Sequence, residues 1–227
     1  DRLRPKVFAI AANVLECAAS DLELRNGAVG IVGVPGAELP LARLAQAARP
    51  GWDHGRPAGI DAGLEETFYY EPPTVTWSYA VHAAIVEVDT ETGDARLVRY
   101  VAVDDVGTVV NPLIVDGQVH GGITQGIATA LYEEALYDED GNLSNGTLAT
   151  YLVPSAAELP SYELDRTESK ATDHPFGAKG VGETGTIAAA PAVINAVIDA
   201  LAHLGVSDIQ MPATPERVWR AIEEAKQ

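Results

Sequence analysis

The chain has little cysteine and little positive charge. Cys17 is the only cysteine among 227 residues, which excludes an internal disulfide and a cluster held by cysteine thiolates. Lys and Arg number 15 against 33 Asp and Glu, for a formal net charge of −18. This charge repels the phosphates of nucleic acids, so we expect no nucleic acid partner. An anionic ligand would have to be held by directed N–H groups and local cations.

Other common signatures are also lacking. No uninterrupted apolar run of about 18 residues and no signal-peptide pattern is evident, so we expect a cytoplasmic protein without a membrane partner. The five histidines show no H-x-x-x-H spacing and no cysteine partner, so no metal held by protein ligands is expected. No serine lies in a nucleophile elbow, and Gly180-Val-Gly182 lacks the rest of a dinucleotide fingerprint. These absences support neither a hydrolase nor a nicotinamide enzyme.

The most informative segment is the glycine-rich stretch 176–187, which leads into an alanine-rich helix. It contains one acid, Glu183, among four glycines: Gly177, Gly180, Gly182 and Gly185. Glycine is used where φ is positive or where a backbone must approach another group closely. Such a loop can direct several N–H groups toward one point, and a carboxylate held there is suited to act as a general base. An ordinary glycine-rich turn with a solvated glutamate is the alternative.

A second segment, 104–133, combines a predicted strand end with a glycine-containing helix. We expect Asn111-Pro112 to end the strand and Asp116 to cap a helix that continues to about Glu133. Apolar residues recur at helical spacing and should face a core: Val119, Ile123, Ile127, Ala130 and Leu131.

Gln118 and Gln125 lie seven residues apart on a different face of this predicted helix. Each amide offers both donors and acceptors, which suits the edge of a heterocycle. Glycines at 121, 122 and 126 each weaken the helix by roughly 0.5–1 kcal/mol, so they indicate that something packs closely against it. A tight crossing of two helices, with the glutamines simply on the surface, is the other interpretation.

The remaining pattern predicts an α+β fold with a mixed sheet, β-hairpins and packed helices. Helices are expected at 5–19, 39–48, from Pro191 onward, and after Thr214-Pro215; strands at 22–24, 29–31, 74–89, 95–104 and around 162–168. Three parts are expected: a helix–hairpin–helix subdomain over 1–50, a Gly- and Pro-rich connection over 51–73 that contains Trp52, His54 and Arg56, and a subdomain over 74–227.

Five short motifs in this order resemble the molybdopterin-binding large subunit of the xanthine dehydrogenase, aldehyde oxidase and carbon monoxide dehydrogenase family. They are Asp105-Val-Gly107, Asn111-Pro112, Gly117-Gln118-Val-His120-Gly-Gly122, Gln125-Gly126 and Lys179-Gly-Val-Gly-Glu183. Each motif alone is weak, but five in register are specific. The resemblance extends from the hairpin at Asp21 to the C-terminus, and the chain resembles only the C-terminal part of the molybdopterin-binding region.

The resemblance implies an oxidoreductase that oxidises an electron-poor carbon of a small-molecule substrate with water as the oxygen source. Glu183 would be the base, and Gln118 with Lys179, Gly180, Val181 and Gly182 would contact a molybdenum–molybdopterin cofactor, expected as the cytosine dinucleotide. The metal would be held by the pterin's sulfurs. Iron–sulfur clusters and FAD would reside on partner domains or subunits, and the remainder of the molybdopterin-binding subunit would be a further partner.

A non-catalytic role stays open beside this interpretation. The family's upstream cofactor-binding and substrate-pocket segments are absent from these residues, and a cofactor bound from one side only would be incompletely desolvated. The chain would then be a pterin-binding or assembly domain that is inactive alone. Its molybdenum content, alone and with its partner, would separate the two interpretations. Purines, aldehydes, aromatic N-heterocycles and carbon monoxide all remain possible substrates.

Overall fold

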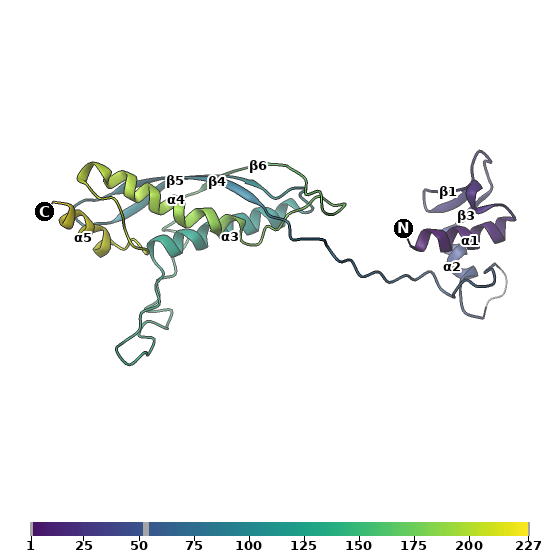
Figure 1. The fold of residues 1–227 in the computed structure, drawn as a ribbon, viewed down its shortest axis with the longest axis horizontal. Helices are drawn as coiled ribbons and strands as arrows, with labels where there is room; N and C mark the ends of the chain where they lie inside the picture. The colour runs from purple at the N-terminus through teal and green to yellow at the C-terminus, as the bar shows by residue number, and fades with distance from the viewer. Residues whose placement is uncertain (1, 52–54, 227) are drawn as a thin grey trace. The chain divides into compact units, whose positions relative to one another are not determined.

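The chain forms two compact units, Asp1–Glu71 and Pro72–Gln227, each with its own hydrophobic core. The computed structural model describes residues 2–51 and 55–226, and the elements are labelled in Figure 1. Trp52 and His54 of the Gly- and Pro-rich stretch lie outside the described residues. Arg56 lies within them and donates from Nη1 to the carbonyl oxygen of Ile60 at 2.5 Å.

The N-terminal unit combines two helices with a small antiparallel sheet of strand order β1-β2-β3. Its elements are α1 (Leu3–Leu15), a 3-10 turn (Ala19–Asp21), β1 (Leu22–Arg25), β2 (Ala28–Ile31), β3 (Glu38–Pro40) and α2 (Leu41–Ala47). The predicted hairpin is confirmed, because Asn26 and Gly27 both take positive φ, 51° and 77°, as a two-residue turn of this kind requires.

Two helix boundaries of this unit differ from the sequence prediction. The first helix ends at Leu15 because Glu16 adopts a left-handed conformation that closes it. Residues 38–40 form a strand before α2 begins. Within the stretch 51–73, Ile60 and Leu64 pack against the core of this unit, and the amide of Gly63 donates to the carbonyl oxygen of Ala48 at 2.6 Å.

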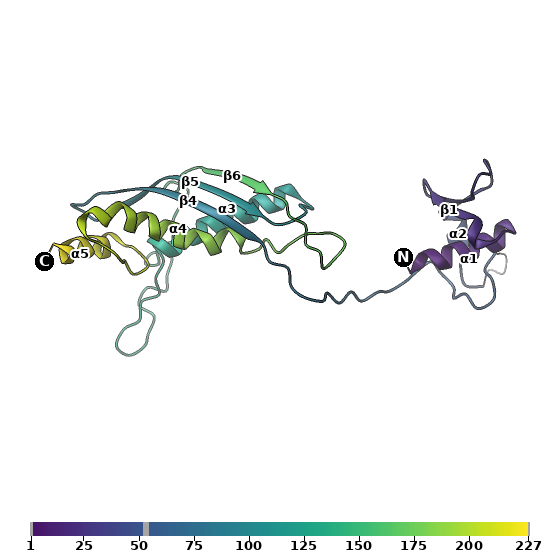
Figure 2. The ribbon, with the colours of Figure 1, turned by 45° about the horizontal axis from the view of Figure 1, so that its top comes forward.

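The C-terminal unit is built on a three-stranded mixed sheet of order β4-β5-β6. Strands β4 (Tyr79–Val88) and β5 (Ala95–Asp105) form the predicted hairpin through Gly93, and β6 (Tyr162–Thr167) runs parallel to β5. Helices α3 (Pro112–Leu131) and α4 (Thr184–Leu201) lie together on one face of this sheet (Figures 1 and 2). The α+β class with a mixed sheet is thereby confirmed. Strand β4 begins at Tyr79 and not at Thr74.

Helix α3 begins five residues earlier than the sequence suggested. Asn111 caps it: the side-chain oxygen accepts from the amides of Leu113 at 3.1 Å and Ile114 at 3.4 Å. Pro112 is the first helical residue, where its missing N–H costs nothing. Asp116, expected to be the cap, lies within the helix. The predicted apolar stripe is confirmed, since all five of its residues are buried.

Helix α4 begins at Thr184, so Pro191 lies inside it and does not start it. Together with the 3-10 turn Ala202–Leu204 it is long and apolar enough to cross a membrane by length and composition, contrary to the expectation that no such run exists. Val193, Val197 and Leu201 place it in the protein core, each with no exposed surface. Helix α5 (Pro215–Ala225) is capped by Thr214, and Val218 and Ile222 are buried, as predicted.

Helices α3 and α4 run parallel and touch through backbone. A Cβ added at Gly185 would lie 2.6 Å from the carbonyl oxygen of Val119, and one added at Gly122 would lie 3.0 Å from the Cα of Gly185. One turn further along, a Cβ at Gly126 would lie 2.5 Å from the Cβ of Ala189. The glycines of α3 at 122 and 126 are therefore explained by a close helix crossing.

Candidate functional site

Glu183 lies at the N-terminus of α4, where it is the residue that precedes the first helical turn. Its carbonyl oxygen accepts from the amides of Thr186 at 3.0 Å and Ile187 at 3.2 Å. Its side chain is exposed and makes no capping hydrogen bond. The N-terminal end of an 18-residue helix carries partial positive charge. A carboxylate that is held by its backbone and free at its side chain can accept a proton from a neighbouring molecule.

Gln118 lies at the same end of the helix pair. It is four residues before Gly122 and therefore on the face of α3 that meets α4. Because Gly122 meets Gly185, the turn of α3 that carries Gln118 lies beside the loop that precedes α4. Gln118 is exposed, and so is Gln125, which lies seven residues or about two turns further along α3. The register of the two helices thus places Gln118 and Glu183 at the same end of the α3–α4 pair.

The glycines near this end differ in what the fold requires of them. Gly177 needs its positive φ of 70°, and Gly185 needs the close approach to α3. Gly180 and Gly182 have ordinary φ values; a Cβ would meet only the Thr76 carbonyl oxygen at 3.8 Å from Gly180, and nothing within 4 Å from Gly182. The chain's own packing therefore leaves the backbone at Gly180–Gly182 bare. Val181 between them packs against the core.

Lys179 points inward, toward the end of β5. Its Nζ lies 2.9 Å from Oδ1 of Asp105 and 2.7 Å from Oγ of Ser169, and it sits 4.3 Å from the centre of the Tyr79 ring. The Lys179 and Asp105 side chains are 9% and 2% exposed. Burial would raise the pKa of the Asp105 carboxyl, but the hydrogen bonds from Lys179 and Gly107 outweigh it and hold that pKa well below its usual range.

Other residues that hold the loop were not singled out from the sequence. Oγ of Ser78 lies 2.5 Å from Oγ1 of Thr184, which also donates to the carbonyl oxygen of Gly180 at 3.2 Å. Thr184 is 4% exposed. Asp105 belongs to one of the matching motifs, but its partner Lys179 is 74 residues away in the sequence. No local pattern signals a contact at that separation.

A buried polar cluster lies under α3, on the other side of β5 from Lys179. Nδ1 of His82 is 2.7 Å from the Tyr100 hydroxyl, and Nε2 is 3.7 Å from Oδ1 of Asp104. Among the described residues, neither carboxylate oxygen of Asp104 has a hydrogen-bond partner, and Asp104 lines a hollow of about 90 Å³. The side chains of Asp104 and Asp105 thus point to different faces of β5 and have different neighbours. Within residues 2–51 and 55–226, no group of three or more His, Cys, Asp or Glu is placed to hold a metal.

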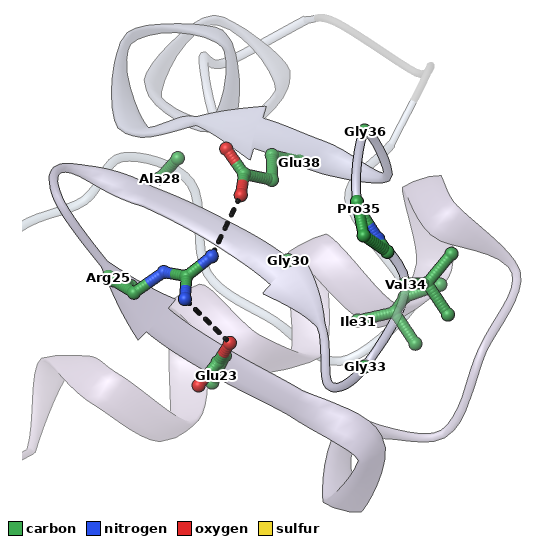
Figure 3. A pocket seen from close by; sticks show the side chains of 10 residues that line it. All are labelled: Glu23, Arg25, Ala28, Gly30, Ile31, Gly33, Val34, Pro35, Gly36 and Glu38. Atoms are coloured by element: carbon green, nitrogen blue, oxygen red, sulfur yellow. Dashed lines mark hydrogen bonds and ion pairs between the residues drawn. The ribbon is translucent and has the colours of Figure 1, made fainter.

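A separate hollow of about 290 Å³ opens on the N-terminal unit, beside β1, β2 and the turn at Gly33–Gly36 (Figure 3). Its charges are paired with one another: Arg25 lies 3.4 Å from Glu38 and 4.0 Å from Glu23. It contains none of the residues expected to act on a cofactor. The candidate site is therefore the open end of the α3–α4 pair.

Comparison with known proteins identifies the class of domain that this fold forms and the family to which it belongs. Residues 1–160 match the molybdopterin cofactor-binding domain. The chain belongs to this family, and its relatives place it within the large subunit of the molybdenum hydroxylases.

The individual relatives are oxidoreductases by name. The chain is 38% identical over 223 residues to the carbon monoxide dehydrogenase large chain of Hydrogenophaga pseudoflava, and 39% over 220 residues to the nicotine 6-hydroxylase large subunit of Paenarthrobacter nicotinovorans. These alignments cover 98% and 96% of the chain but 27% of each relative. The chain thus spans about a quarter of the length of the curated relatives it matches.

Two solved structures share the fold over almost the whole chain. The Cu,Mo carbon monoxide dehydrogenase in its carbon monoxide reduced state matches with a TM-score of 0.87 at 37% identity, over 99% of this chain and 28% of that chain. Quinoline 2-oxidoreductase from Pseudomonas putida 86 matches with a TM-score of 0.86 at 41% identity, over 98% and 28%. The family resemblance read from the five motifs is confirmed.

Proposed function

We propose that this chain is the part of a molybdenum hydroxylase that presents a general base, Glu183, to the substrate beside the molybdopterin cofactor. The observation that carries the proposal is that an exposed carboxylate, Glu183, and the exposed amide of Gln118 lie at the same end of the α3–α4 pair. When bound, the cofactor supplies the redox chemistry and the metal, whereas the protein supplies position, a proton acceptor and electrostatics.

The residues at this end fit such a cofactor in kind and in shape. Gly180 and Gly182 are not required by local packing, so they leave a bare backbone that a flat ligand can approach. The backbone N–H groups of Gly180, Val181 and Gly182 are donors suited to anionic oxygens, and Gln118 offers a donor and an acceptor to a heterocycle edge. The net charge of −18 gives such a ligand no general attraction, so directed donors must hold it.

Lys179 supports the same loop from its inner side. We propose that it contributes to cofactor binding by positioning Gly180, Val181 and Gly182, because its ammonium contacts Asp105 and Ser169 and its amide donates to the carbonyl oxygen of Val106. The cytosine dinucleotide form of the cofactor, iron–sulfur and flavin partner subunits, a small-molecule substrate and a cytoplasmic location belong to this proposal. The names of the relatives, which include a nicotine hydroxylase and a carbon monoxide dehydrogenase, support partner subunits but leave the substrate class open.

The test is the substitution Glu183→Gln in the assembled enzyme that contains this chain. It keeps the shape of the side chain and removes the proton acceptor, so turnover should fall by at least ~10², with molybdenum content unchanged. Glu23→Gln, on the N-terminal unit, is the matched control and should leave turnover unaltered. A fully loaded Glu183→Gln enzyme with normal turnover would refute the base and favour a purely cofactor-binding or assembly role.

A further inference from the structure

We propose that the buried ion pair of Asp105 and Lys179 is a positioning device for Glu183, which fixes where the glycine loop leaves the sheet. The inference rests on the proposed function of Glu183. It concerns groups that do not touch the substrate: the carboxylate at the end of β5 and the ammonium four residues before Glu183.

Asp105 is the fixed end of the device. Its Oδ1 accepts from Nζ of Lys179 at 2.9 Å and from the amide of Gly107 at 3.0 Å, and its Oδ2 accepts from Oγ1 of Thr167 at 3.2 Å. Thr167 is the last residue of β6, which pairs with β5. The carboxylate therefore joins both strands to the loop at the same point, away from water.

The backbone of the loop around Lys179 is also hydrogen-bonded to the end of β5. The amide of Lys179 donates to the carbonyl oxygen of Val106 at 2.8 Å, and the amide of Thr108 donates to the carbonyl oxygen of Gly177 at 3.0 Å. Gly107 takes a φ of +63°, and an added Cβ would lie 2.2 Å from the Gly177 carbonyl oxygen. The loop thus lies against the strand end so closely that only glycine fits between them.

A second anchor holds the far end of the same loop. Thr184 is tied to Ser78 at 2.5 Å and to the carbonyl oxygen of Gly180 at 3.2 Å, and Thr186 donates to the carbonyl oxygen of Gly122 at 3.0 Å. Between Lys179 and Thr184 lie only Gly180, Val181, Gly182 and Glu183. Of these four, Gly180 accepts from Thr184 and Val181 packs against the core, so the position of the Glu183 carboxylate follows from these contacts and from the two anchors.

Such positioning matters because a general base acts only within hydrogen-bond reach of the proton it removes. A displacement of about 1 Å caused away from the reacting atoms can lower the rate by about 10²-fold. The device therefore predicts an effect on kcat with little effect on KM. It also predicts local loosening of residues 180–183 that is measurable without cofactor or substrate.

The experiment compares the double variant Asp105→Asn/Lys179→Met with the wild type. Both charges are removed together, so no unpaired charge is left buried and the fold should survive. We expect amide hydrogen exchange at 180–183 to rise by about tenfold in the purified chain, with exchange at 193–201 of α4 unchanged. In the assembled enzyme kcat should fall by about 10²-fold at a similar KM. The matched control is Glu87→Gln/Arg96→Met, which removes an exposed pair at 2.7 Å on the same sheet and should change neither quantity.

Unchanged exchange at 180–183 in the folded double variant would overturn the proposal. If that variant does not fold, Ser169→Ala removes one partner of Lys179 and should raise exchange at 180–183 about threefold, whereas unchanged exchange would overturn the proposal. If Glu183 is not the general base, a different pair of results is expected. In that case Glu183→Gln retains turnover while the double variant still loosens the loop.

Discussion

Replacing Gly185 by alanine tests the backbone contact between α3 and α4. The added Cβ would lie 2.6 Å from the Val119 carbonyl oxygen and 3.0 Å from the Ile123 nitrogen, inside the ordinary contact distance of 3.4 Å. Both atoms are backbone, so no side chain can move aside and the helices must separate. Overpacking of this kind costs about 1–3 kcal/mol, and here it exceeds the roughly 0.5–1 kcal/mol that alanine gains over glycine within a helix.

Gly117→Ala is the matched control on α3, because a Cβ at that position meets nothing within 4 Å. It should raise the free energy of unfolding by about 0.5–1 kcal/mol, while Gly185→Ala should lower it by about 1–2 kcal/mol. Urea unfolding followed by circular dichroism gives both values from the shift of the midpoint at a constant slope. Equal midpoints for the two variants would show that the helices do not cross at Gly185, and the shared end of Gln118 and Glu183 would lose its basis.

Two further predictions concern charge and the cofactor. The folded state depresses the pKa of Asp105 below its ordinary value of 3.8, so the pair stabilises the protein above that pH and the stabilisation is lost as pH falls further. Acid unfolding of Asp105→Asn/Lys179→Met should therefore show a shallower loss of stability below about pH 4 than the wild type, and equal slopes would contradict the pairing. Gln118→Ala should lower molybdenum content or turnover of the assembled enzyme while leaving the thermal unfolding midpoint of the chain in place, because Gln118 is exposed and the buried stripe of α3 is untouched. Unchanged molybdenum content and turnover would mark Gln118 as a surface residue.

Local patterns in the sequence were sufficient for most of the elements. Asn26-Gly27 predicted a hairpin because both residues tolerate positive φ, and Thr214-Pro215 predicted a helix start because its cap is local. Asn111-Pro112 was misread, although the rule behind it holds: Asn111 is extended, with φ −137° and ψ 105°, while Pro112 itself opens α3. The pattern could not show which side of the proline the helix occupies.

Long-range contacts explain what the sequence could not predict. Pro191 would ordinarily begin or break a helix, but α4 packs against α3 and β4, and this burial outweighs the lost hydrogen bond. Lys179 appeared available to a ligand, whereas its buried partner Asp105 comes from a distant strand. The location of Gln118 and Glu183 at the same end follows from the glycine crossing, where Gly122 meets Gly185 from 63 residues further along the chain. The motifs led us to propose Gln118 and Glu183 as site residues, whereas the contacts that hold the loop before Glu183 are visible only in the packing.

The glycine crossing also has a mechanical consequence. Where two helices are separated by side chains, rotamer changes and core substitutions can shift them by small steps, whereas peptide groups in direct contact have no such freedom. The spacing between the Val119 turn and Gly185 is therefore set by covalent geometry and hardly by the surrounding core. Substitutions elsewhere in the core can then accumulate without changing the spacing of the two helices at the end that carries Gln118 and Glu183. Rigidity at this end comes from the direct contact between the two backbones at Gly122 and Gly185.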